Sequence, residues 1–135
     1  MQNEVTEIET DVLVVNLFEG VTSPGGATGA VDKMIGGLIT DLIVDGEISG
    51  SESELTLIHT SNSVYPDLKA SRVLIAGLGS SDRIDTNAIR RVSATVIRKL
   101  REVGVKKFAT IVHGAGIGGV DVSSSAQSLV EGSLL

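Results

Sequence analysis

The sequence predicts an α/β fold in which helices cover both faces of a mixed, mostly parallel sheet, a three-layer α/β/α arrangement. Runs of β-branched and other aliphatic residues alternate with segments whose apolar residues recur at helical spacing. These runs are continuously apolar, which indicates strands that are buried on both faces. The 135 residues match the usual size of one domain, so a single domain over 1–135 is expected.

The first half of the chain contains three predicted strands and one predicted helix. Residues 5–9 (VTEIE) alternate weakly, as an edge strand does, and residues 11–17 (DVLVVNL) form a buried run. A glycine-rich loop follows over 19–29, where Pro24 and the glycines at 25, 26 and 29 give unusual backbone conformations. A helix is predicted from Ala30 to about Ile43, and residues 54–60 (ELTLIHT) read as the third strand.

The second half carries the clearest helix of the sequence. A buried strand over 72–79 (RVLIAGLG) precedes it, and Asp85 or Thr86 is placed to cap its first turn. Gly104 stands where a left-handed residue ends a helix. One apolar stripe runs along the helix through Ile89, Val92, Val96, Leu100 and Val103.

The last part of the chain is predicted to add a strand, a second glycine loop and a final helix. The strand covers 106–113 (KKFATIVH), and the loop HGAGIGGV follows it. The final helix is expected over 123–135, with the serines at its start as caps.

The composition excludes several classes of site. No cysteine is present, so disulfides, thiolate zinc sites and cysteine nucleophiles are excluded. Only three aromatic side chains occur, which leaves few platforms for stacked bases or flat cofactors. The acidic, polar start does not resemble a secretory signal, and no apolar run approaches the ~20 residues of a membrane helix. A soluble cytoplasmic protein with no membrane partner is expected.

Charge is unevenly distributed along the chain, whose net charge is -6. Residues 1–70 hold two basic against twelve acidic side chains, whereas 71–135 hold nine basic against five acidic. Seven of the eleven basic residues lie between Arg90 and Lys107. This basic helix is either a solvated face or a contact for an acidic partner or nucleic acid, and the overall acidity argues against DNA.

Both glycine-rich stretches follow a buried strand and precede a predicted helix, the setting in which free backbone amides bind anions. Gly114, Gly116 and Gly119 match the spacing GxGxxG, but the chain ends before the acidic residue that a dinucleotide site needs. Neither stretch ends in the Gly-Lys-Ser or Gly-Lys-Thr of a Walker loop. The two loops are therefore either a phosphate site or tight strand-to-helix turns.

No catalytic or metal-binding residue is predicted in this chain. His59 and His113 have no carboxylate at ligand spacing, and the serine runs lack a nucleophile-elbow motif. His113 borders the second glycine loop, where its cationic form would strengthen contact with a bound anion. Asp32 is expected near the start of the first helix, where the helix dipole favours a carboxylate.

Four stretches of the sequence resemble known families. DVLVVNLFEGVTSPGGATGAVDKMIGG is similar to the macro-domain pattern in which a strand with an asparagine leads into a Gly-Gly-rich loop and a helix. RVLIAGLGSSDRID, AIRRVSATVIRKLREVGVKK and IVHGAGIGGVDVSSSAQSLVEGSLL follow in the order typical of the N-terminal domain of the leucyl aminopeptidases, the cytosol aminopeptidase family. The resemblance covers about residues 7–135 and implies a macro-domain-like fold.

The resemblance also implies a function. Family members continue into a catalytic domain, where two divalent metals, zinc or manganese, activate water for cleavage of an N-terminal peptide bond. The Asn-Thr-Asp-Ala-Glu-Gly-Arg segment that supplies metal ligands there is absent from this chain. The chain is therefore expected to be a non-catalytic domain with an assembly or regulatory role. Its expected partners are its own catalytic domain and the other subunits of a hexameric parent.

The alternative that the resemblance offers is a module that binds ADP-ribose or another phosphorylated small molecule through the two loops. The pattern of ligand-binding macro domains is incomplete, because the adenine-binding Gly-Asp-Ile/Val-Thr stretch has no counterpart in EVTEIETD. A phosphate-sized anion would still fit. The candidate binding residues are Asn16, Gly25, Gly26, Gly29, His113, Gly114, Gly116 and Gly118.

Overall fold

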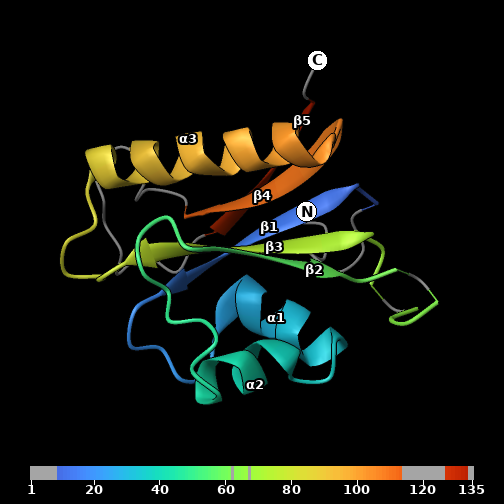
Figure 1. Ribbon diagram of the computed structural model, residues 1–135, viewed down its shortest axis with the longest axis horizontal. Coiled ribbons are helices and arrows are strands. Elements are labelled where there is room, and N and C mark those ends of the chain that lie inside the picture. The colour runs from blue at the N-terminus through green and yellow to red at the C-terminus, as the bar shows by residue number, and fades with distance from the viewer. Residues whose placement is uncertain (1–8, 62, 67, 114–126, 134–135) are drawn as a thin grey trace.

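The computed structural model describes residues 9–61, 63–66, 68–113 and 127–133. Its strands form one five-stranded sheet in the order β2-β3-β1-β4-β5. The strands are β1 (Val12–Phe18), β2 (Leu55–His59), β3 (Arg72–Gly79), β4 (Lys107–His113) and β5 (Gln127–Ser133). The helices are α1 (Gly26–Met34), α2 (Leu38–Val44) and α3 (Thr86–Val103). Figure 1 shows α3 on one face of the sheet and α1 and α2 on the other, which confirms the predicted three layers.

The sheet is mixed, as predicted, and its parallel pairs are confined to the three central strands. β1 pairs in parallel with β3 and with β4. The outer strands β2 and β5 pair antiparallel with β3 and β4. The central strands therefore lie under helices on both faces, which is why β1 and β3 read as continuous apolar runs.

The prediction of a helix over 123–135 is wrong, because residues 127–133 form β5. This strand makes seven registered antiparallel pairs with β4, from Lys107 with Ser133 to His113 with Gln127. A short apolar pattern does not distinguish a buried strand from a helix. Pairing with the edge of β4 satisfies the backbone of this segment, and that tertiary contact outweighs local preference.

The single helix predicted over 30–43 is also wrong, since two helices occupy this region and the first begins at Gly26. Gly36 and Gly37 have φ of +73° and +82°, a left-handed conformation that ends α1 and turns the chain into α2.

Asp32 lies near the end of α1, not near the start of the first helix as predicted. Its carboxylate accepts hydrogen bonds from the amides of Ile39 (2.7 Å) and Thr40 (3.3 Å), and so caps α2.

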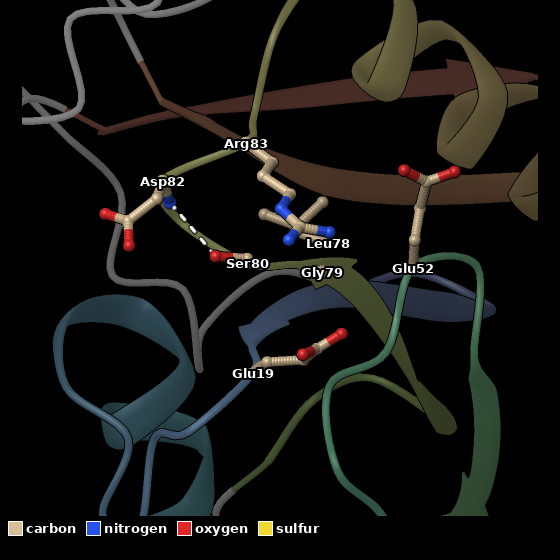
Figure 2. A pocket seen from close by; sticks show the side chains of 7 residues that line it. All are labelled: Glu19, Glu52, Leu78, Gly79, Ser80, Asp82 and Arg83. Atoms are coloured by element: carbon tan, nitrogen blue, oxygen red, sulfur yellow. Dashed lines mark hydrogen bonds between the residues drawn. The ribbon is translucent and has the colours of Figure 1, made fainter.

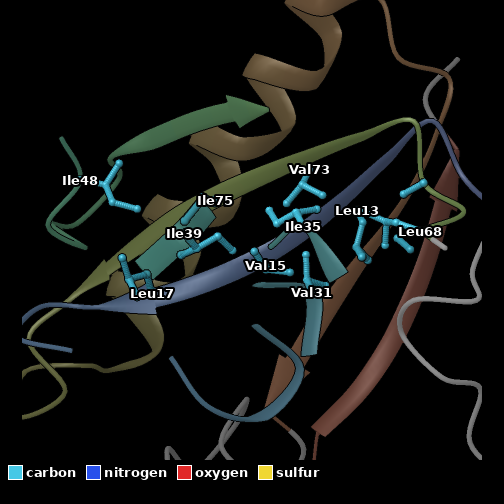
Figure 3. Close-up of a cluster of buried hydrophobic side chains, with 12 residues drawn as sticks. Leu13, Val15, Leu17, Val31, Ile35, Ile39, Ile48, Leu68, Val73 and Ile75 are labelled. Carbon is cyan, nitrogen blue, oxygen red and sulfur yellow. The ribbon is translucent and has the colours of Figure 1, made fainter. Parts of the chain in front are cut away.

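Two aliphatic clusters hold the layers together. Alternate residues of β1 enter opposite clusters, as the period of a strand requires. Leu13 and Val15 pack with α1 and α2 in the cluster drawn in Figure 3, and Val12 and Val14 pack toward α3. The cluster residues of β1 are at most 3 % exposed. Burial of this aliphatic surface is the main stabilising contribution to the fold.

Helix α3 has the ends that its sequence predicts. The carboxylate of Asp85 accepts a hydrogen bond of 2.7 Å from the amide of Ala88, and Gly104 ends the helix with φ of +84°. Val92, Val96 and Leu100 of the predicted stripe are buried. Within the described ranges, no helix is long and apolar enough to cross a membrane.

Candidate functional site

The carboxyl ends of β1 and β3 meet at a point where the chain leaves in two directions. After β1 it passes to α1 on one face of the sheet, and after β3 it passes to α3 on the other face (Figure 1). Such a topological switch point leaves a crevice outside the strand ends, where open α/β sheets bind ligands. The candidate functional site of this protein is therefore expected there.

A hollow of about 390 Å³ lies at this switch point. Figure 2 shows the residues that line it, which come from the position after β1, the loop before β2, the end of β3 and the segment after β3. The lining residues are Glu19, Glu52, Leu78, Gly79, Ser80, Asp82 and Arg83.

Glycines let the loop before β2 lie directly on the strand ends. The amide of Gly79 donates to the carbonyl of Gly50 (2.8 Å), and the amide of Glu19 donates to the carbonyl of Gly79 (3.0 Å). Gly50 has φ of +82°, and a Cβ there would stand 2.6 Å from the carbonyl oxygen of Phe18. A Cβ on Gly77 would collide with the carbonyl oxygen of Ser51. Only glycine permits this approach, which holds Glu52 at the rim of the hollow.

The hollow is predominantly acidic. Glu19, Glu52 and Asp82 supply three carboxylates to its lining, against the single guanidinium of Arg83. Arg91 of α3 donates from Nε and Nη2 to the two carboxylate oxygens of Glu52, at 2.8 and 2.9 Å. This bidentate pair ties the loop before β2 to α3. The charge of the lining disfavours a phosphate in this hollow unless cations from elsewhere compensate.

Hydrogen bonding and charge from Arg91 hold the pKa of Glu52 below its ordinary value. The ion pair therefore stabilises the fold fully at pH values above the ordinary carboxyl pKa. This contribution is lost as the pH falls through the lowered pKa of Glu52. We expect Arg91→Ala to return the pKa of Glu52 to its ordinary range in a side-chain NMR titration. Arg90→Ala is the control, because no ion pair to Arg90 occurs among the described residues. An unchanged Glu52 pKa in Arg91→Ala would contradict this role of Arg91.

The first glycine loop builds a strand-to-helix turn. Gly25 is the N-cap of α1, and Gly26 follows with φ of +57°. A Cβ on Gly29 would stand 2.5 Å from the carbonyl oxygen of Pro24, so this position requires glycine for packing. The hydroxyl of Thr28 donates to the backbone carbonyl of Asn16 in β1 (2.8 Å) and fastens the helix to the strand. These glycines and Asn16 do not line the hollow of Figure 2.

The second glycine loop falls outside the described residues, and with it Gly114, Gly116 and Gly118. The structure places the backbone of His113 at the end of β4, beside β5. The convergence of the two loops on one anion thus stays a prediction.

Sequence reasoning missed Glu19, Glu52, Asp82 and Arg83 as residues around a common hollow. Three of them follow the buried strands β1 and β3, and polar residues at the carboxyl ends of parallel strands are a signal that could have identified them. Glu52 comes from a loop whose position depends on glycine contacts. Over the described ranges, no three His, Asp or Glu side chains gather as ligands of a metal ion do.

Comparison with known proteins agrees with this architecture. The family model "Cytosol aminopeptidase family, N-terminal domain" matches residues 14–135. A probable cytosol aminopeptidase of Solibacter usitatus is 34% identical over 129 residues, covering 96% of this chain and 23% of the relative. One of Alkaliphilus metalliredigens is 27% identical over 135 residues, covering 100% of this chain and 26% of the relative. The chain thus spans about a quarter of these relatives.

A solved structure shares the fold. The macrodomain of Mycobacterium tuberculosis DarG superposes with a TM-score of 0.65 and 17% identity, covering 93% of this chain and 82% of that chain. This likeness confirms the predicted macro-domain-like architecture.

Proposed function

Because this chain belongs to the cytosol aminopeptidase family and corresponds to its N-terminal domain, we propose that it is a non-catalytic domain with an assembly or regulatory role. Its parent would be a leucyl aminopeptidase-like metallo-exopeptidase of the cytoplasm. The observation that carries this proposal is that residues 14–135 match the family model of the N-terminal domain. The relatives in which this domain occurs are about four times as long as this chain. The partners would be the catalytic domain and the other subunits of the parent.

The residues that the structure describes do not fit the dimetal centre of such an enzyme. Two adjacent divalent ions need several carboxylates that converge on them. In the part of the chain that the structure describes, no three candidate ligands converge, and Glu52 of the hollow is engaged with Arg91. We therefore assign the zinc or manganese pair of the parent to a separate catalytic domain.

A hydrolysis assay tests this proposal. We expect the chain, incubated with leucine p-nitroanilide and manganese, to release no more nitroaniline than a heat-killed sample. A full-length cytosol aminopeptidase, such as the Pseudomonas aeruginosa relative, serves as the positive control under the same conditions. Metal-dependent hydrolysis by the chain that persists on further purification would overturn the proposal.

The macro-domain-like fold favours a second candidate, the binding of ADP-ribose or another phosphorylated small molecule through the two glycine loops and not through the acidic hollow. A ligand at a concentration of 100 times its dissociation constant raises the free energy of unfolding by about 2.7 kcal/mol, so a shift of the thermal unfolding midpoint would report its binding. Gly116→Val would obstruct the second loop and should abolish that shift. No shift with millimolar ADP-ribose would contradict this candidate.

A further inference from the structure

The outer face of α3 bears a shallow apolar hollow between arginines. It measures about 440 Å³ and is lined by Ser93, Ala94, Ile97, Arg98 and Arg101. Ala94, Ile97, Arg98 and Arg101 are spaced by three, one and three residues, so they share one stripe of the helix. This stripe lies outside the switch-point site, and we call it the α3 hollow.

The arginines of the α3 hollow are uncommitted within the described residues. The ion pairs found there join Arg91 to Glu52 and Lys99 to Glu102, and neither involves Arg98 or Arg101. Arg98 and Arg101 are both exposed residues. Unpaired arginines around an apolar floor are typical of protein-protein contacts, because Arg is enriched at interfaces.

Helix α2 carries the complementary arrangement. Val44 is 73% exposed, the largest exposure among the large hydrophobic residues of the described chain. Asp41 and Asp45 stand three residues before it and one residue after it, so the three form one stripe, here called the α2 knob. Both aspartates belong to exposed residues, and neither carboxylate has an ion pair in the described structure.

Folding of α2 does not explain this stripe. Asp45 is at the C-terminal end of the helix, where the helix dipole disfavours a carboxylate, and the last turn has no basic residue. An exposed valine at this position also gains nothing from burial within the monomer. A contact outside the monomer would satisfy both features.

From this pairing we propose that two copies of this chain associate head to tail, with the α2 knob of one copy seated in the α3 hollow of the next. Val44 meets Ala94 and Ile97, and the aspartates meet Arg98 and Arg101. The knob cannot reach its own hollow, since α2 and α3 lie on opposite faces of the sheet (Figure 1). The contact is therefore heterologous and generates a ring or an open array of copies.

A second copy suits the α3 hollow better than nucleic acid does. The hollow has an apolar floor, and the chain as a whole carries a net charge of -6, which opposes approach to a phosphate backbone. The acidic knob supplies charge of the opposite sign on the same molecule. This contact deepens the assembly role proposed above and rests on that proposal for its biological setting.

Sedimentation velocity tests the contact directly. One helix stripe on another buries less surface than a standard interface of ~1,600 Å², so we expect weak association, visible at about 1 mM chain and absent at about 10 µM. At low ionic strength the average mass should rise from 14.0 kDa toward at least twice that value. At about 500 mM salt, where the Debye length is short, the rise should be largely lost.

Charge reversal in two variants separates this contact from nonspecific association. Asp41→Lys/Asp45→Lys and Arg98→Glu/Arg101→Glu should each remain monomeric, because like charges then face each other. An equimolar mixture of the two should associate again, since every knob meets a hollow of opposite sign in an alternating array. Lys106→Glu/Lys107→Glu is the matched control for the arginine variant, because it makes the same change of net charge outside the α3 hollow, and it should associate like the original chain.

Several outcomes would overturn the proposal. These are a mass that stays at that of one copy at every concentration, association that survives the reversals, or a mixture that stays monomeric. Salt-dependent binding of duplex DNA that Arg98→Glu/Arg101→Glu abolishes, without self-association, would assign the hollow to nucleic acid instead. Peptide hydrolysis by the chain would refute the proposed function without affecting these results, so the two failures are distinguishable.

Discussion

Replacing Gly77 with alanine should lower the free energy of unfolding by about 3 kcal/mol, because overpacking against a fixed backbone is strongly destabilising. The new Cβ would collide with the carbonyl oxygen of Ser51 and stand 2.8 Å from the carbonyl carbon of Gly50. The loop that carries these atoms cannot withdraw freely, because two hydrogen bonds hold it to β3. The amide of Ser53 donates to the carbonyl of Gly77 (3.0 Å), and the amide of Gly77 donates to the carbonyl of Glu54 (2.8 Å). Urea unfolding measures the effect.

Gly25→Ala is the control for this prediction. A Cβ on Gly25 would meet no atom within 4 Å, and the φ of -112° suits alanine, so the substitution fits without collision. Its cost should be about 1 kcal/mol or less, the usual preference for glycine over alanine at an N-cap. Equal stability of Gly77→Ala and the original chain would show that the loop before β2 does not lie on the strand ends as described.

Asp32→Ala should also cost about 3 kcal/mol, because it removes a buried acceptor and leaves its donors unsatisfied. Asp32 is 7% exposed, and its carboxylate accepts from the amides of Ile39 and Thr40 and from the hydroxyl of Thr40 (2.6 Å). Without it the start of α2 loses its cap beside the aliphatic cluster of Figure 3. Thermal or urea unfolding measures the loss.

Asp45→Ala is the matched substitution, since Asp45 is exposed and its carboxylate makes no ion pair in the described structure. Its effect should lie within about 0.5 kcal/mol, as for most surface changes. If both substitutions cost the same, Asp32 would not be the residue that joins α1 to α2.

The central elements were predictable because their signals are local. The continuous apolar runs of β1 and β3 follow from burial on both faces, and the stripe through Val92, Val96 and Leu100 follows from the helix period. The ends of α3 followed from side-chain and backbone chemistry at Asp85 and Gly104. In each case neighbouring residues alone decide the structure.

The remaining features depend on distant contacts. Residues 127–133 form a strand because β4 offers an edge, which no local pattern reveals. The break between α1 and α2 depends on hydrogen bonds from the amides of Ile39 and Thr40 to the carboxylate of Asp32. These bonds exist only when both helices are in place. The hollow at the switch point joins residues as distant as Glu19 and Arg83, so strand order had to be known before its lining could be assigned.

We expect this chain to fold by itself around its aliphatic clusters and to carry no dimetal centre. The midpoint of thermal unfolding, measured in a chelator and in millimolar manganese or zinc, tests both expectations together. A ligand that binds only the folded state raises stability, so a structural or catalytic metal pair would raise the midpoint. We predict one cooperative transition with the same midpoint in the chelator and in either metal. A reversible, metal-dependent rise that saturates at two ions per chain would contradict this prediction.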